Sequence, residues 1–166
     1  MKLAELAKQQ KEADKRMTEN WSVRDGMIWF SGAGANLCSV NDYGDFELFV
    51  DWRITKGGDS GVYLRGTPQV QIWDPARVDV GAQVGSGGLY NNTPGTLGRN
   101  PIEKKDKPFG QWNSFRILQI GARTWVTLND RLVVEGAAME NYWDPGNSLP
   151  ATGPFMLQTH GGEIRW

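Results

Sequence analysis

The stretch from Asp45 to Ile54 alternates between a wholly apolar set of side chains and a mainly charged set. Successive residues of a β-strand point to opposite faces, so this period of two predicts a strand with one face in a core. Antiparallel sheets commonly bury one face and leave the other in solvent. The predicted inner set is Phe46, Leu48, Val50, Trp52 and Ile54, and the outer set is Glu47, Phe49, Asp51 and Arg53.

Short β-prone runs between Gly, Asn, Asp and Pro fill the rest of the chain, which has 21 glycines in 166 residues. This punctuation is typical of an all-β antiparallel sandwich. No composition shift marks a linker, so we predict one domain with its sandwich over residues 21–166, and Val62, Leu64, Ile72 and Leu157 join the predicted core. The predicted strands are Trp21–Val23, Met27–Phe30, Asn36–Ser39, Phe46–Ile54, Gly61–Arg65, Val70–Trp73, Ser114–Ile120, Arg123–Leu128, Arg131–Glu135 and Phe155–His160.

The N-terminal segment has a different period. Its apolar residues Leu3, Leu6, Ala13 and Met17 recur at helical spacing between charged and amide residues. This pattern predicts a short surface helix over residues 2–17. We expect the helix to dock against the sandwich and cover an edge or an end of a sheet.

Charge and cysteine content exclude several classes of function. The chain has 18 basic and 19 acidic residues, a net charge of -1, so no basic surface for nucleic acid or anionic membranes is expected. Cys38 is the only cysteine and His160 the only histidine, which excludes an internal disulfide and a Cys/His zinc cluster. No apolar run is long enough to span a bilayer, and the N-terminal residues lack the apolar core of a signal peptide. Because basic and acidic residues nearly cancel, we expect the molecule that binds this chain to be uncharged.

The outer faces of several predicted strands carry groups that suit a sugar. Alternation directs these side chains away from the core: Tyr63, Arg65, Gln69, Gln71, Trp73, Gln158 and His160. Sugars offer hydroxyls to planar polar groups and C–H faces to aromatic rings, so this surface predicts a carbohydrate site. The Gly-, Asn- and Pro-rich segment Asp74–Phe109 is long for a loop, and loops of that length are usually functional. We expect it to roof part of the site.

Each of these residues also has an ordinary structural role. An outward Arg65 can be a solvated salt-bridge partner. His160 can be a structural hydrogen-bonding group, although imidazole is the side chain that changes charge nearest neutrality. Gln71 and Gln158 can pair with backbone at a sheet edge, and Asp74, which precedes a proline, can simply form a turn. Alternation alone therefore names no reaction.

Six sequence blocks give the chain a specific resemblance. They are, in order, DYGDFELFVDWRI, GDSGVYLRG, VQIWD, GSGGLYNN, KPFGQWNSFRI and GPFMLQTHGGEIRW. In these blocks the chain resembles the 3-keto-disaccharide hydrolases over nearly its whole length. The resemblance implies a concanavalin A-like lectin/glucanase sandwich, or jelly roll, in a periplasmic or cell-surface setting. The outermost strands of the family have no counterpart in the pattern, which implies self-association or a strand-completing partner, and Gln69 stands where many relatives have Glu.

The resemblance implies chemistry on a sugar whose C3 carries a ketone. A base removes the acidified proton at C2, the enolate expels the C1 substituent, and water adds back. His160, Glu47 or Asp51 would serve as base or acid, and Arg65 or a bound divalent metal ion would polarise the C3 oxygen. The implied substrate-binding residues are Gln69, Gln71, Trp73, Asp74, Tyr90 and Gln158. The alternative is a non-catalytic carbohydrate-binding module on the same sandwich.

Overall fold

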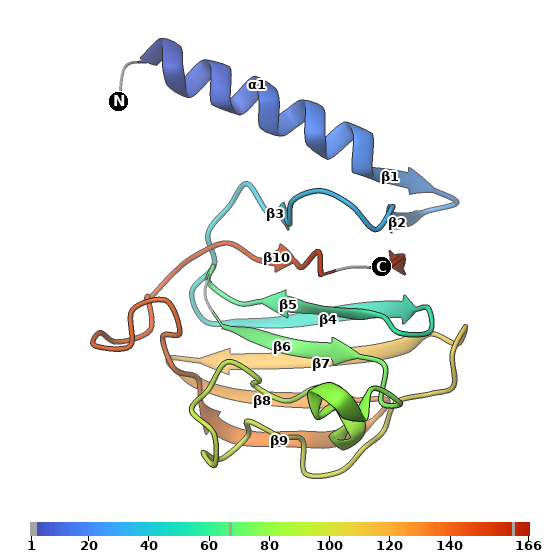
Figure 1. Ribbon diagram of the computed structural model, residues 1–166. Helices are drawn as coiled ribbons and strands as arrows, with labels where there is room; N and C mark the ends of the chain where they lie inside the picture. The colour runs from blue at the N-terminus through green and yellow to red at the C-terminus, as the bar shows by residue number, and fades with distance from the viewer. Residues whose placement is uncertain (1–2, 67, 161) are drawn as a thin grey trace.

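Two antiparallel β-sheets form the body of the computed structural model, which describes residues 3–66, 68–160 and 162–166. Figure 1 shows the sheets lying one over the other, with the N-terminal helix apart from both. Within the described part, the larger sheet has seven strands, in spatial order β1 (Trp21–Arg24), β2 (Met27–Phe30), β11 (Ile164–Arg165), β4 (Phe46–Ile54), β7 (Asn113–Ile120), β8 (Arg123–Leu128) and β9 (Arg131–Ala138). The smaller has four, β3 (Leu37–Cys38), β10 (Met156–Leu157), β5 (Asp59–Tyr63) and β6 (Gln69–Trp73). The prediction of a β-sandwich is confirmed.

The core lies between the two sheets and follows the predicted alternation. In β4, Trp52 and Ile54 are buried, and the other apolar residues of the inner set are half-buried against the core. In the smaller sheet, Val62 and Ile72 are 1% and 0% exposed. Full burial of such a side chain contributes about 1.5–3 kcal/mol, so the inner faces supply most of the stability of the fold. Leu64 is also buried, and Leu157 packs half-buried against the same cluster.

The pattern of the sequence predicts no strand after His160, but the structure has one. Ile164–Arg165 form β11, which pairs with β2 on one side and β4 on the other. The preceding β10 pairs with both β3 and β5. Two residues are too few to show an alternation, which is why the pattern missed β11. The segment 156–165 therefore supplies inner strands to both sheets.

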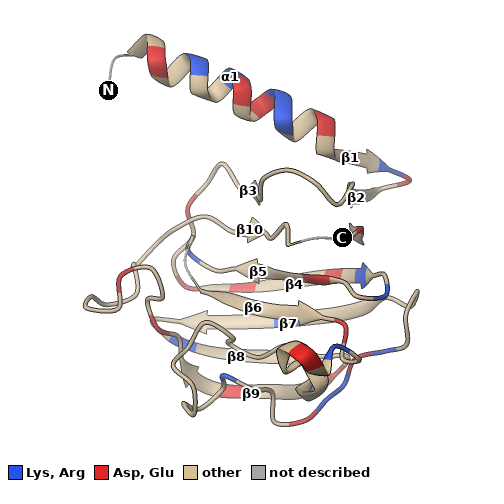
Figure 2. Cartoon of the chain, in the orientation of Figure 1, with Lys and Arg blue, Asp and Glu red and all other residues tan. Residues whose placement is uncertain are grey.

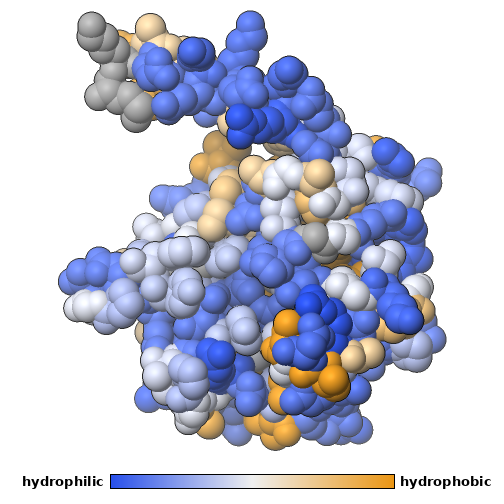
Figure 3. All heavy atoms as spheres, in the orientation of Figure 1, coloured by the Kyte–Doolittle hydropathy of each residue, from blue (hydrophilic) through white to orange (hydrophobic). Residues whose placement is uncertain are grey.

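The predicted N-terminal helix is present, but it does not dock as expected. Helix α1 covers Leu3–Asn20, three residues further than predicted, and residue 2 lies outside the described part. No residue of α1 is buried, and Leu3 is 86% exposed. Figure 3 shows the helix standing off the body, and Figure 2 shows both signs of charge along it. The helix has too few large apolar residues to bury a continuous stripe against the sheets.

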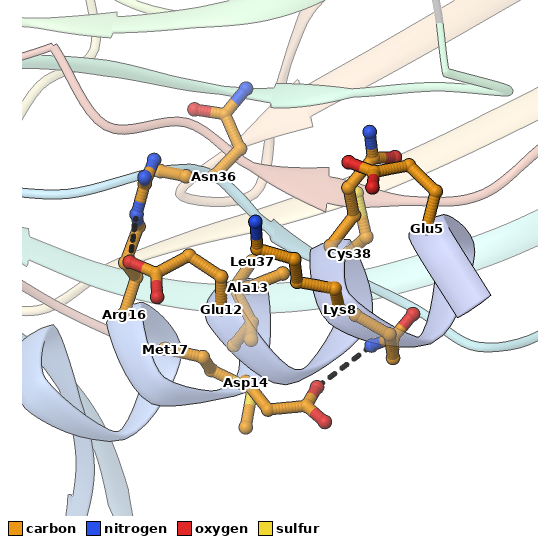
Figure 4. Close-up of a pocket in the computed structure, with 13 residues that line it drawn as sticks. Glu5, Lys8, Glu12, Ala13, Asp14, Arg16, Met17, Asn36, Leu37 and Cys38 are labelled. Atoms are coloured by element: carbon orange, nitrogen blue, oxygen red, sulfur yellow. Dashed lines mark hydrogen bonds and ion pairs between the residues drawn. The ribbon is translucent and has the colours of Figure 1, made fainter.

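A cleft of about 520 Å³ separates α1 from β3 and the residues before it. Figure 4 shows its lining, with charged side chains of the helix opposite Asn36, Leu37 and Cys38. Within the helix, Arg16 pairs with Glu12 at 3.2 Å between Nε and Oε1. The helix is therefore stabilised by its own i,i+4 pairs rather than by packing. No helix of the described residues is long and apolar enough to cross a bilayer.

Candidate functional site

The outer face of the four-stranded sheet collects the polar residues of β5 and β6. The two strands pair with Asp59 opposite Trp73, Gly61 opposite Gln71, and Tyr63 opposite Gln69. Directly opposite residues of an antiparallel pair share a face, so these side chains all point away from the core. Gly61 adds no side chain, and a Cβ there would lie 3.0 Å from the Gln69 side-chain Cδ. The glycine therefore leaves room for this amide.

Asp59, the first residue of β5, has three polar partners on this face. Its Oδ1 accepts a hydrogen bond from Nε2 of Gln71 at 2.7 Å, and its Oδ2 lies 3.1 Å from Nδ1 of His160. Nη1 of Arg77 lies 3.9 Å from the same Oδ2. The Asp59 side chain is 14% exposed, whereas that of His160 is 61% exposed. A sheltered carboxylate thus orients an imidazole that faces solvent.

Tyr63 and Gln158 form the second polar group on the face. Gln158 continues past β10, where its backbone N donates to the Gly61 carbonyl at 2.9 Å. Its side-chain Nε2 donates to the Tyr63 hydroxyl oxygen at 3.2 Å. Burial raises the pKa of Tyr63, the hydrogen bond from Gln158 opposes this rise, and Tyr142 and Asp59 add to it. The phenol therefore remains protonated at neutral pH, and its O–H is available as a donor.

Two buried amide oxygens on this face have no hydrogen-bond partner among the described residues. They are Oε1 of Gln69 and Oε1 of Gln158, on side chains of residues that are 4% and 8% exposed. Gln69 uses its Nε2 to donate to the amide oxygen of Gln71. Leaving a buried acceptor unsatisfied costs about 1–3 kcal/mol. Both oxygens are closed off from solvent, so this cost is borne by the fold itself.

The structure places Arg65 away from this group. Strand β5 ends at Tyr63, and Arg65 follows at φ +52°, a left-handed conformation that breaks the alternation. Its buried guanidinium donates to the carbonyls of Gly44 at 3.0 Å and Pro150 at 3.2 Å, and pairs with Asp45 at 3.0 Å. Arg65 therefore ties loops together at the end of β5 far from Asp59. The expectation that it shares one pocket with Gln71, Gln158 and His160 is corrected.

Glu47 and Asp51 lie on the opposite side of the sandwich. Both are exposed on the outer face of β4, which belongs to the seven-stranded sheet. Glu47 pairs with Nε of Arg116 at 2.5 Å. The two sheets turn their inner faces to each other, so neither carboxylate can reach a ligand beside His160. Their predicted catalytic roles are not supported by this placement.

The remaining predicted residues divide between structure and site. Asp74 is buried, and its carboxylate accepts hydrogen bonds from the backbone N of Gly57 at 2.7 Å and of Ala76 at 2.8 Å. It therefore has the structural role of a turn residue. Trp73 is fixed by donation from Nε1 to the Gly85 carbonyl at 2.7 Å. Its ring meets the ring of Tyr90 at 5.0 Å between centroids. Tyr90 is half-buried, and its contact with Trp73 places one aromatic ring of the long loop beside this face.

Three residues of the group escaped the sequence analysis: Asp59, Tyr63 as a donor, and Arg77. Asp59 lies an even number of residues before Tyr63 and so points to the same face of β5. The sequence analysis did not include it because the predicted strand began only at Gly61. Arg77 lies in the irregular loop before the 3₁₀ helix η1 (Val78–Val80), where no periodicity exists. In the described ranges no three His, Cys, Asp or Glu side chains are grouped in a way that could hold a metal ion.

Comparison with known proteins identifies the family to which the chain is similar. A family model described as the 3-keto-alpha-glucoside-1,2-lyase-like domain matches residues 6–166. A "3-keto-disaccharide hydrolase" from Bacteroides thetaiotaomicron is 25% identical over 162 residues, which cover 77% of this chain and 54% of the relative. The chain thus spans about half the length of that curated relative.

Solved structures share the fold. A "putative glycosyl hydrolase" from Parabacteroides distasonis is 21% identical with a TM-score of 0.65, over 87% of this chain and 70% of the other. A carbohydrate-binding module, CBM66 from Bacillus subtilis, is 13% identical with a TM-score of 0.55, over 87% and 86%. At these identities the likeness concerns the sandwich architecture, which serves both hydrolases and binding modules.

Proposed function

The chain belongs to the 3-keto-alpha-glucoside-1,2-lyase-like domain family, and on that premise we propose that it cleaves glycosides whose sugar carries a ketone at C3. The ketone makes the proton on C2 acidic, so a base can remove it and the resulting enolate can expel the C1 substituent. Water then adds across the C1–C2 double bond. This route needs one base, one group on the C3 oxygen and one proton donor at the leaving oxygen, rather than the two carboxyls of ordinary glycoside hydrolysis.

The Asp59–His160 pair is the observation that carries this proposal. In the proposed arrangement Nδ1–H of His160 donates a hydrogen bond to Oδ2 of Asp59, 3.1 Å away. In this neutral tautomer Nε2 carries no proton and points away from the carboxylate. Gln71 holds the other oxygen of Asp59, so the carboxylate has a fixed position. An exposed imidazole with a fixed tautomer suits the base that takes the C2 proton.

Arg77 and Tyr63 supply the other two groups in the proposed reaction. Arg77 lies beside the same carboxylate oxygen as His160 and pairs through Nη2 with the exposed Asp79 at 3.1 Å. Its permanent charge suits the developing enolate at the C3 oxygen, for which it would exchange the exposed partner. Tyr63 lies further along β5 and can give its proton to the departing C1 oxygen. On hydration, the hydroxide part of water bonds to C1 while its proton returns to Tyr63, and His160 returns the proton to C2.

A turnover assay with two sugars tests the proposal. The protein is incubated with methyl 3-keto-glucoside and with its unoxidised parent, and release of the free sugar is followed. We expect release from the ketone alone. Asp59→Asn should lower kcat by about 10²-fold or more, because positioned acid–base catalysis contributes about 10²–10⁴-fold. Asp51→Asn, an exposed aspartate on the opposite outer face, is the matched control and should keep wild-type turnover.

Two outcomes would contradict the proposal. Equal release from both sugars would remove the ketone from the mechanism. Wild-type kcat in Asp59→Asn would rule out a catalytic role for the Asp59–His160 pair. In addition, His160→Gln should lower kcat by about 10²-fold or more, because the proposed base is lost, and wild-type kcat in this variant would show that the histidine is merely structural.

A binding module without catalysis is the second candidate function. The aromatic rings and amides gathered on this face favour it, because such groups can hold a sugar without any chemistry. Calorimetric binding of the unoxidised glucoside, with no release of sugar from the 3-keto form, would establish this function instead.

A further inference from the structure

A second cleft opens beside the outer face of the four-stranded sheet. Its volume is about 770 Å³, within the range of small-molecule sites. One wall comes from the loop around Tyr90–Arg99 and the other from the segment around Met139–Leu149. The two walls are far apart in the sequence, so their meeting is a product of the fold.

Hydrogen bonds between the walls fix the shape of this cleft. Nδ2 of Asn92 donates to the Ala138 carbonyl at 2.8 Å, and its Oδ1 accepts from the backbone N of Glu140 at 3.0 Å. The Glu140 carboxylate accepts from the backbone N and the hydroxyl of Thr93, at 2.8 and 2.6 Å. Asn92 is 1% exposed, so its two bonds are largely sheltered from water, whereas those between Thr93 and Glu140 are exposed. The cleft is therefore preformed.

The cleft adjoins the Asp59–His160 face at two points. The ring of Tyr90, which lines the cleft, meets the ring of Trp73. The side-chain oxygen of the neighbouring Asn91 accepts from the backbone N of Gln69 at 3.1 Å. Gln69 in turn lies opposite Tyr63 in the β5–β6 pair, and Tyr142, on the other wall of the cleft, adds to the raised pKa of Tyr63. A ligand in the cleft can therefore extend from the proposed proton donor.

The chemistry of the lining suits a neutral ligand rich in hydroxyls. The two charged side chains, Arg99 and Glu140, are already engaged, since Arg99 lies 4.7 Å over the Tyr90 ring and donates to two backbone carbonyls. The rest of the lining is uncharged. It consists of asparagine amides that also hold the loops together, hydroxyl groups, apolar side chains such as Leu149, and the exposed ring of Tyr142. Amides pair with hydroxyls and aromatic rings pack against C–H faces of a sugar.

We propose that this cleft holds the second sugar ring of the substrate, the ring that leaves from C1. The inference rests on the proposed function, because it takes Tyr63 as the donor to the oxygen between the two rings. The ketone-bearing ring then lies over Gln71 and His160, and the leaving ring lies between Tyr90 and Tyr142.

Comparison of two substrates tests the inference. Tyr142→Ala is expected to raise KM for a 3-keto-disaccharide about three- to tenfold, the range expected for loss of one aromatic contact. Its KM for methyl 3-keto-glucoside, which has no second ring, should change less than about twofold. Tyr142 is 47% exposed, so the substitution should not unfold the protein. Phe49→Ala, an exposed aromatic residue on the opposite outer face, is the control and should leave both values unchanged.

Equal changes in KM for the two substrates, or no change for either, would overturn the inference. Calorimetric titration with the unoxidised disaccharide and with methyl glucoside decides it even where no turnover occurs. Weaker binding of the disaccharide alone in Tyr142→Ala supports the cleft as a sugar site, and equal binding by both proteins rejects it. Failure of the wild type to turn over any 3-keto sugar would instead refute the proposed reaction.

Discussion

Replacing Arg65 with Met tests whether this buried guanidinium holds loops together or takes part in catalysis. Met keeps an unbranched apolar side chain in the same space and removes only the charge and the donors. Three contacts are lost, to the carbonyls of Gly44 and Pro150 and to the carboxylate of Asp45. All three lie at the end of β5 away from His160, so the chemistry should be spared.

The loss of stability can be estimated from these contacts. A hydrogen bond from a charged group to a buried partner contributes about 1.5–3 kcal/mol. Gly44 and Pro150 are half-buried, so water replaces part of each bond, and the Asp45 side chain is 62% exposed, which limits that ion pair to about 0–1 kcal/mol. The free energy of unfolding should therefore fall by about 3 kcal/mol. For a domain of this size the corresponding fall in Tm is about 6–12 °C.

Calorimetry and kinetics on the same preparation check this prediction. Tm is measured by scanning calorimetry, and kcat/KM for methyl 3-keto-glucoside is measured well below the lowered Tm. We expect a lower Tm with kcat/KM within about twofold of wild type. An unchanged Tm would mean that the three contacts contribute nothing. A fall in kcat/KM of about 10²-fold in folded protein would return Arg65 to the mechanism.

Two further substitutions follow from the structure. Tyr63→Phe should lower kcat by about 10²-fold, as expected for loss of a positioned donor. The lost hydrogen bond from Gln158 should lower the free energy of unfolding by only about 1 kcal/mol. Loss of the folded state in calorimetry would contradict this assignment. Deletion of residues 3–17 should change Tm by less than about 2 °C, because no residue of α1 is buried and surface changes have small effects. A fall of about 10 °C would show that α1 packs on the body after all.

Alternation predicted which face of a strand each residue occupies, and much of the fold followed from it. Strands β4 and β8 have the predicted bounds, and the apolar residues of β4 point inward. The same parity brought Gln71 and His160 to one carboxylate, that of Asp59. Parity works there because both residues lie in, or directly continue, extended segments.

The errors have physical reasons of two kinds. Parity is defined within one strand and does not say which sheet the strand joins, so Glu47 and Asp51 were assigned to the wrong side of the sandwich. Parity also fails where the backbone leaves the extended region, as at Arg65 with φ +52°. Arg77 reaches Asp59 from an irregular loop, and no periodic pattern in the sequence predicts the direction of a side chain there. The contribution of Asp59 depended on a strand boundary misplaced by two residues.

The position of β10 and β11 inside the two sheets has a consequence for synthesis of the chain. Among the residues that the structure describes, the β1–β2 hairpin joins β4 through β11 alone, and β3 joins β5 through β10 alone. On the ribosome, these early strands therefore wait for residues 156–165 before they can complete either sheet, and pairings over such long sequence separations form slowly. Until then β4 and β5 present unpaired edges of the kind that chaperones must protect. His160 lies between β10 and β11, so a nascent chain acquires its imidazole just before it can close the larger sheet.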